Sequence, residues 1–128
     1  MLERLRIAGE LYDAGETTSE LNVIASWPQF VREVFDLMPV QGEPARADLA
    51  ARMRAVPVAY AGLRETYRQA AAQGRVAARR QVAACARQCE EWSAAGGYYA
   101  RLAERIGATG ADREELDAAA EEIGRAHV

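Results

Sequence analysis

The sequence lacks lysine altogether, so its 16 basic residues are all arginine. It has only two cysteines, Cys85 and Cys89, and its one histidine, His127, lies in a C-terminal tail that is set aside below, so the three or four ligands of a zinc site are not expected. It has no apolar run near the ~18 residues of a membrane span, and no secretory signal opens it. These absences argue against a metal centre, a membrane partner and secretion, and they make the cytoplasm the expected location.

Charge and motifs exclude further classes. The net charge of −3 argues against nucleic acid as a partner, because phosphate binding needs a concentrated basic surface. The pair Arg79-Arg80 is too small a cluster to change that conclusion. The chain has no Gly-x-Gly-x-x-Gly motif, no phosphate loop and no Gly-x-Ser-x-Gly elbow. We therefore predict no cofactor and no catalytic, cofactor-binding or metal-binding residue in this chain.

The amino-acid composition favours helices. The 128 residues suit one domain, and about a fifth of them are alanine, the strongest helix former. No stretch alternates apolar and polar residues as a strand would. We therefore predict an all-α fold, an irregular antiparallel helical bundle of about five to seven helices that forms a partial domain.

Apolar spacing and helix-end signals place these helices. Ser26 and Gln29 form a capping box, and Pro39 ends the helix that they begin. Pro57 is expected to force a corner or kink and to open a further helix, for which Gly74 is the C-terminal cap. The predicted helical ranges are 2–13, 27–38, 44–56, 57–73, 78–92, 98–106 and a last segment from 112, with a packed connection at 14–25 that carries Leu21, Val23 and Ile24.

The helix after Ser26 has a wide apolar stripe at helical spacing, made by Trp27, Phe30, Val31, Val34, Phe35 and Met38. We expect Phe30, Val34, Phe35 and Met38 to be buried, and Arg32 and Glu33 to be accessible. Together with Asp36, these two charged residues have two open interpretations. They form salt bridges at the surface, or they bind across to a second half of the protein.

Three other groups of residues could have a chemical role, but for each of them a purely structural role is favoured. Cys85 and Cys89 share a helix face, as two metal ligands would, but they fall on an apolar seam where free cysteine packs as a small hydrophobe. Tyr98-Tyr99 after a double glycine could line a ligand pocket, but one buried and one exposed ring is the favoured interpretation. The acidic pairs are expected to be solvated, since adjacent helical positions do not face each other; they are Glu90-Glu91, Glu114-Glu115 and Glu121-Glu122.

The last seven residues, 122–128, match the translation of a widely used short-read sequencing adapter. We therefore divide the chain into residues 1–121, the N-terminal helical part of a larger helical protein, and residues 122–128, a read-through tail to be set aside in fold reasoning. A natural helix end of that sequence is the alternative. His127 belongs to this tail.

The block from Leu21 to Pro39 resembles the N-terminal signature of the bacterial domain-of-unknown-function family 885. The matching elements are Leu21-Asn22, Ala25-Ser26 with Pro28, Arg32, and the run Phe35-Asp36-Leu37-Met38-Pro39. The resemblance continues through the corner from Arg54 to Pro57 and the stretch from Gly74 to Val82. It covers most of residues 1–107.

The resemblance implies a larger helical parent whose C-terminal half carries a His-Glu-x-x-x-Gly-His-His-type block, similar to that of zinc peptidases. Such a parent is expected to be a metal-dependent hydrolase of peptide-like substrates, with zinc as its cofactor. Nothing in this chain matches that block, so no site residue can be carried over.

We therefore expect a non-catalytic N-terminal helical fragment whose partner is the missing C-terminal half. Self-association is also expected, because the apolar stripes at both ends of the chain lack partners. The alternative is a free-standing helical protein-interaction module, which a stop codon soon after Glu121 would favour.

Overall fold

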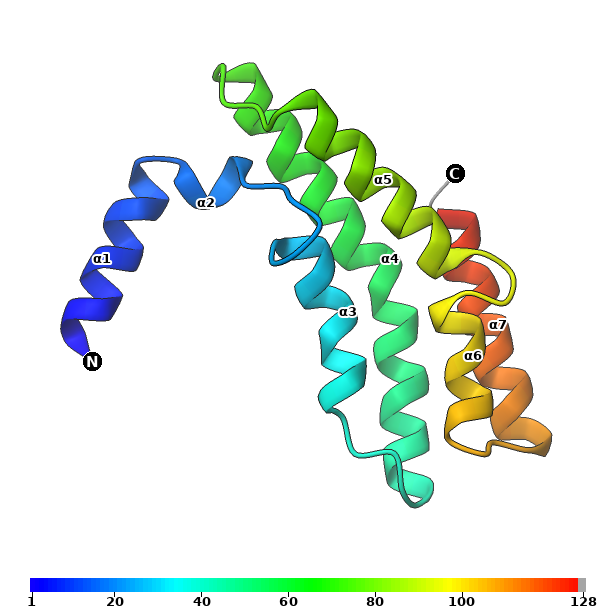
Figure 1. Cartoon of the computed structure of the whole chain (residues 1–128). Coiled ribbons are helices and arrows are strands. Elements are labelled where there is room, and N and C mark those ends of the chain that lie inside the picture. Colours follow the sequence, from blue (N-terminus) through cyan, green and yellow to red (C-terminus); the bar gives the residue numbers. More distant parts are fainter. Residues whose placement is uncertain (127–128) are drawn as a thin grey trace.

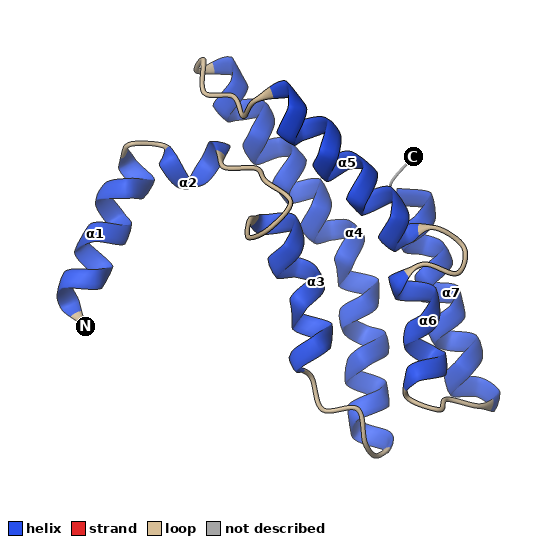
Figure 2. Cartoon of the chain, in the orientation of Figure 1, coloured by secondary structure: helices blue, strands red, loops and turns tan. Residues whose placement is uncertain are grey.

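The computed structural model describes residues 1–126, and the residues in that range form helices and loops without a strand (Figures 1 and 2). The all-α prediction is confirmed. The helices are α1 (Leu2–Asp13), α2 (Glu16–Ser19), α3 (Trp27–Leu37), α4 (Glu43–Ala72), α5 (Arg79–Ser93), α6 (Tyr98–Arg105) and α7 (Gly110–Ala126). His127, in the set-aside tail, lies outside the described residues.

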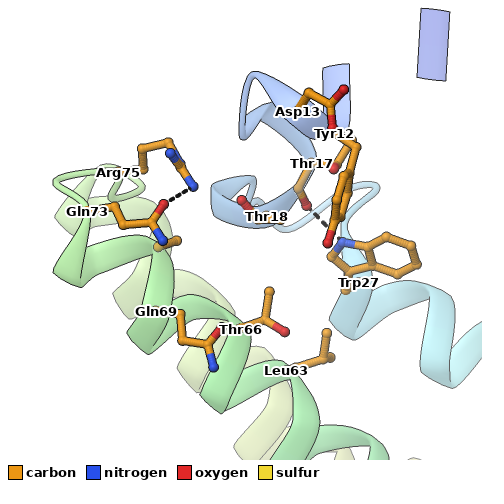
Figure 3. Close-up of a pocket in the computed structure, with 11 residues that line it drawn as sticks. Tyr12, Asp13, Thr17, Thr18, Trp27, Leu63, Thr66, Gln69, Gln73 and Arg75 are labelled. Carbon is orange, nitrogen blue, oxygen red and sulfur yellow. Dashed lines mark hydrogen bonds between the residues drawn. The ribbon is translucent and has the colours of Figure 1, made fainter. Parts of the chain in front are cut away.

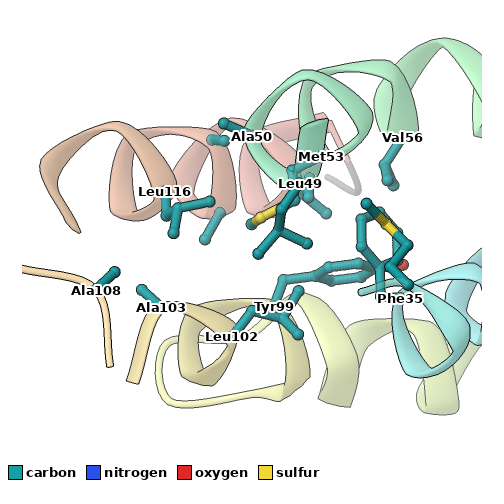
Figure 4. Close-up of a cluster of buried hydrophobic side chains, with 14 residues drawn as sticks. Phe35, Leu49, Ala50, Met53, Val56, Tyr99, Leu102, Ala103, Ala108 and Leu116 are labelled. Carbon is teal, nitrogen blue, oxygen red and sulfur yellow. The ribbon is translucent and has the colours of Figure 1, made fainter. Parts of the chain in front are cut away.

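The bundle is organised around α4 and α7, which pack against each other. α3 also packs on α4, and α6 packs on α7, so the core lies among these four helices (Figure 4). Phe35, Leu49, Met53 and Tyr99 fill its centre, and the ring of Phe35 meets the ring of Tyr99 edge to face at 5.6 Å. The apolar faces of these four helices therefore pack together in one shared core.

Pro57 lies inside α4, so the prediction of a corner and a new helix at this residue is wrong. An internal proline removes one backbone hydrogen bond and costs about 3 kcal/mol. Packing on both sides offsets that cost. Met53 and Val56 are buried in the core before it, and after it the Tyr60 hydroxyl donates to the Pro28 carbonyl at 3.2 Å.

The predicted connection 14–25 contains α2, which sequence reasoning missed. The short helix follows Gly15, whose φ of 80° favours glycine. Leu21 is half-buried, but Val23 and Ile24 are exposed, so the prediction that this segment is packed is wrong for them. The side chain of Asn22 explains the exposure. Its Oδ1 accepts hydrogen bonds from the backbone N–H groups of Ile24 and Ala25 at 2.8 Å, and this tight turn directs Ile24 outward.

The two ends of the chain differ. α7 buries Leu116, Ala119, Ala120 and Ile123, so the expectation that both terminal stripes lack partners is wrong for the C-terminal helix. Ile123 is a core residue although it belongs to the segment 122–128 that the sequence interpretation set aside. The coding origin of that segment stays a prediction.

Glycines shape two helix boundaries, and the first of them, the C-terminal cap of α4 at Gly74, is as predicted. Gly74 has a φ of +77°, and the N–H of Arg75 donates to the Ala70 carbonyl at 2.9 Å, which closes α4. Between α5 and α6, a Cβ on Gly97 would lie 2.4 Å from the Glu91 carbonyl oxygen, so only glycine fits this close turn.

Candidate interaction surface

The first feature of the candidate surface is α1, whose residues are all exposed. Leu5 and Tyr12 lie on one side of the helix, and Leu2, 84% exposed, extends that side toward the N-terminus. The other side is polar: Arg6 forms ion pairs with Glu3 and Glu10, one turn away in each direction. Figure 1 shows α1 standing apart from the bundle. The expectation of an N-terminal apolar stripe without a partner is therefore confirmed within residues 1–126.

The second feature is the outer face of α3. Phe35 and Met38 are buried as predicted, but Phe30 and Val34 are 43% and 41% exposed, so the prediction of their burial is wrong. Trp27 and Leu37 are exposed beside them. The apolar stripe is wider than one packing contact: its inner half enters the core, and its outer half has no cover in the described part of the chain.

A buried hydrogen-bond network fixes the start of α3. The predicted capping box is present, and Gln29 Oε1 accepts a hydrogen bond from the Ser26 backbone N–H at 2.9 Å. Gln29 Nε2 donates to Gln88 Oε1 on α5 at 2.7 Å, while the Cys85 thiol lies 2.8 Å from the Asn22 carbonyl. Because buried polar groups are costly unless paired, this network gives α3 a single orientation. The outer face is therefore presented by a rigid helix.

The charged residues of α3 also bind within the chain. The guanidinium of Arg32 lies 4.9 Å from the ring centroid of Tyr98 and 5.3 Å from that of Trp92, and it forms a 2.9 Å ion pair with Asp36. The Tyr98 hydroxyl donates to Asp36 at 2.7 Å. Burial raises the pKa of Tyr98, and its hydrogen bond to Asp36 raises it further.

This arrangement supports the salt-bridge interpretation of the charged trio, because Arg32 and Asp36 form an ion pair one turn apart on α3. Cation–π contacts of Arg32 with Trp92 and Tyr98 also hold α3 to α5 and α6. Binding of the trio to a second half of the protein stays a prediction. Glu33, half-buried on the same helix, makes no ion pair in the described part of the chain.

Two hollows adjoin the exposed faces. A hollow of about 610 Å³ lies between the α1–α2 corner and α4, and in Figure 3 Tyr12 and Trp27 lie next to each other at its edge. Trp27 Nε1 donates to the Thr17 carbonyl at 3.0 Å, which holds α2 there. A shallower, mainly apolar groove of about 220 Å³ lies between α3 and α4, lined by Val31, Val34, Phe35, Arg52, Ala55, Val56 and Ala59.

The cysteines are buried, as predicted. Cys85 and Cys89 lie on the inner side of α5 as free thiols. Burial raises the pKa of Cys89 to about 11, which keeps it protonated and a poor nucleophile at neutral pH. Among residues 1–126, no group of three or more His, Cys, Asp or Glu side chains could hold a metal ion.

The remaining candidates, the tyrosine pair and the acidic pairs, have structural rather than chemical roles in the described part of the chain. Tyr99 is buried, as one ring of the pair was predicted to be, but Tyr98 is half-buried rather than exposed, because it contacts Arg32 and Asp36. The acidic pairs Glu90-Glu91, Glu114-Glu115 and Glu121-Glu122 are exposed. Although α4 has 30 residues, no helix in the described part of the chain combines the length and apolarity needed to cross a bilayer.

Comparison with known families gives a match over residues 1–128 to the model described as "Bacterial protein of unknown function (DUF885)". The chain belongs to this family. The resemblance drawn from the block at Leu21–Pro39 is thereby confirmed, and the match extends over the whole chain. None of the curated proteins compared with this DUF885 chain matches it.

Sequence reasoning missed one part of this surface. The residues Ala55 and Ala59 were not singled out, because helix propensity alone explains the presence of alanine in a helix. Their 4-residue spacing places them on one face of α4, where they leave room beside Val34. That spacing was the only available signal, and it acquires meaning only when α3 lies next to it.

Proposed function

We propose that this DUF885 chain is a non-catalytic helical part of a larger protein, and that it packs through the outer faces of α1 and α3 against the segment that carries the chemistry. The observation that supports the proposal most is the pair of uncovered apolar faces. Leu2 on α1 and Leu37 on α3 are 84% and 85% exposed, and large contiguous apolar patches mark interfaces.

The chemistry of the parent is the finer part of the proposal. By the resemblance described above, the remaining segment is that of a zinc-dependent hydrolase of peptide-like substrates, and zinc binds there rather than here. The family description names no activity, so the support for this part is family membership alone. The role of this chain is then to cover apolar surface and give the other segment a rigid wall.

The proposal is tested with the uninterrupted gene. The codons after Glu121 should continue in frame and encode a His-Glu-x-x-x-Gly-His-His-like block, and the segment they encode should form a stable complex with residues 1–121 on co-expression. Leu37→Asp should weaken that complex, whereas Val76→Asp, a similarly exposed position at 70% in the loop between α4 and α5, should leave it intact. A stop codon soon after Glu121 would instead favour the free-standing interaction module.

Zinc titration of the isolated chain gives a separate check. We expect no tight one-to-one binding, since Cys85 and Cys89 are buried and their neighbourhood supplies no third ligand among residues 1–126. A tight site measured by isothermal titration calorimetry, and lost in the Cys85→Ala, Cys89→Ala double variant, would contradict the non-catalytic role.

A further inference from the structure

We infer that two copies of this 128-residue chain pair by exchanging α1, so that α1 of each copy lies in the groove between α3 and α4 of the other. The inference rests on the proposed function in one respect, because it uses the same uncovered faces of α1 and α3. It says what covers these faces when the rest of the parent protein is absent. The occupant is the one amphipathic helix in the described residues that buries none of its own side chains.

The shapes of the two surfaces are complementary. An amphipathic helix binds by laying its apolar side into an apolar groove. The α3–α4 groove has Val31 and Val34 on one wall and the small residues Ala55 and Ala59 on the other, which let a helix approach closely. On α1, Leu5 and Tyr12 form a stripe at helical spacing that can fill such a groove.

The charges beside these surfaces are complementary too. Arg4 and Asp13 of α1 flank the Leu5–Tyr12 stripe on opposite sides, because positions nine apart lie about 180° apart around a helix at 3.6 residues per turn. Neither residue makes an ion pair within the described residues. Arg52 of α4 lines the groove, and Glu33 borders the exposed apolar face of α3 on the side away from the groove, one turn from Phe30 and Leu37. Neither Glu33 nor Arg52 makes an ion pair within the described residues. The arrangement matches Arg4 with Glu33 of the second copy, and Asp13 with Arg52 of the second copy.

The exposed area is sufficient for a stable pair. At roughly 200 Å² for a large side chain, the exposed parts of the apolar residues on α1 and α3 amount to on the order of 1,000 Å² per chain. Two exchanged helices cover these faces on both copies, so the pair buries up to about 2,000 Å², within the range of specific interfaces.

The corner between α1 and α2 favours exchange over closure within one copy. Gly15 is buried and has a φ of +80°. It lies so close to the Arg75 side chain that a Cβ added to it would be 2.2 Å from Nε of Arg75. Two hydrogen bonds hold the following segment to the bundle, one from Trp27 Nε1 to the Thr17 carbonyl and one from the Tyr67 hydroxyl to the Glu20 carbonyl, both at 3.0 Å. α1 thereby stands apart from α3 and α4 of its own copy, as Figure 1 shows.

The test is analytical ultracentrifugation of the 128-residue chain over a concentration series. We expect a monomer–dimer equilibrium in which Arg4→Glu and Glu33→Arg each raise the dissociation constant about tenfold, because each places like charges together. The double variant should return the constant to within about threefold of the wild type. All three variants change exposed or half-buried side chains without ion pairs, so their melting curves should match the wild type when monomeric.

The outcomes separate this inference from the proposed function. A chain that remains monomeric across the series, an assembly larger than a dimer, or a double variant that does not recover pairing would overturn the exchange of α1. If such a monomer still binds the downstream segment of the parent protein, the proposed function stands and only the exchange fails. If it binds neither, both fail.

Discussion

The two phenylalanines of α3 provide a sharp test of how this helix is placed. They lie on the same helix and carry the same side chain, but Phe35 is 3% exposed and Phe30 is 43% exposed. Phe35→Ala empties a site in the core against Tyr99 and should lower the free energy of unfolding by about 3–5 kcal/mol. Phe30→Ala loses the burial of about half a side chain, roughly 1–1.5 kcal/mol, and an edge-to-face contact with Trp27 worth about 0.5–1.5 kcal/mol, so it should cost about 1.5–3 kcal/mol in total.

The assay is thermal and urea unfolding followed by circular dichroism, at a concentration where the chain is monomeric. For a chain of this length each kcal/mol shifts the melting temperature by about 4 °C, so Phe35→Ala should melt roughly 12–20 °C lower and Phe30→Ala roughly 6–12 °C lower than the wild type. Phe30→Ala thus serves as the matched control. Equal losses for the two variants, or a larger loss for Phe30→Ala, would mean that α3 is rotated about its axis and that the outer face described here is wrong.

The remaining predictions concern the cap and the buried thiol. Ser26→Ala should lower the free energy of unfolding by about 0.5–2 kcal/mol in urea denaturation, because α3 loses its cap; an unchanged midpoint would contradict the capping role. Burial raises the pKa of Cys89 from 9.0 to about 11, so the protonated thiol stabilises the fold below pH 9 and this contribution disappears as the pH rises toward 11. Urea denaturation under reducing conditions should show that the free energy of unfolding falls by about 2 kcal/mol less in Cys89→Ala than in the wild type between those two pH values, and an identical fall would contradict the assignment.

Local signals along the chain were sufficient to predict most of the helices and their ends. The Ser26–Gln29 capping box and the stop at Gly74 act within a few residues of themselves, so they can be recognised without knowledge of the fold. The burial of Cys85 and Cys89 was also predictable, because their spacing places both on one helix face and free cysteine favours the interior.

Longer-range packing decided what these signals could not. Pro57 ends a helix in isolation, but here the core contacts of α4 on both sides of it stabilise the uninterrupted helix. The apolar stripe of α3 could not reveal by itself which half enters the core, because that depends on where the neighbouring helices pack against it.

The candidate surface depends on the same distinction. The amino-acid sequence by itself determined that α1 is amphipathic, that Arg4 and Asp13 flank its apolar stripe, and that Ala55 and Ala59 share a face of α4, since all three follow from helical periodicity. Only the tertiary structure decided that α3 lies beside those alanines and that α1 stands apart from α3 and α4 of its own copy. Periodicity acts within one helix, whereas a groove requires two helices, and their relative position depends on contacts between residues far apart in the chain.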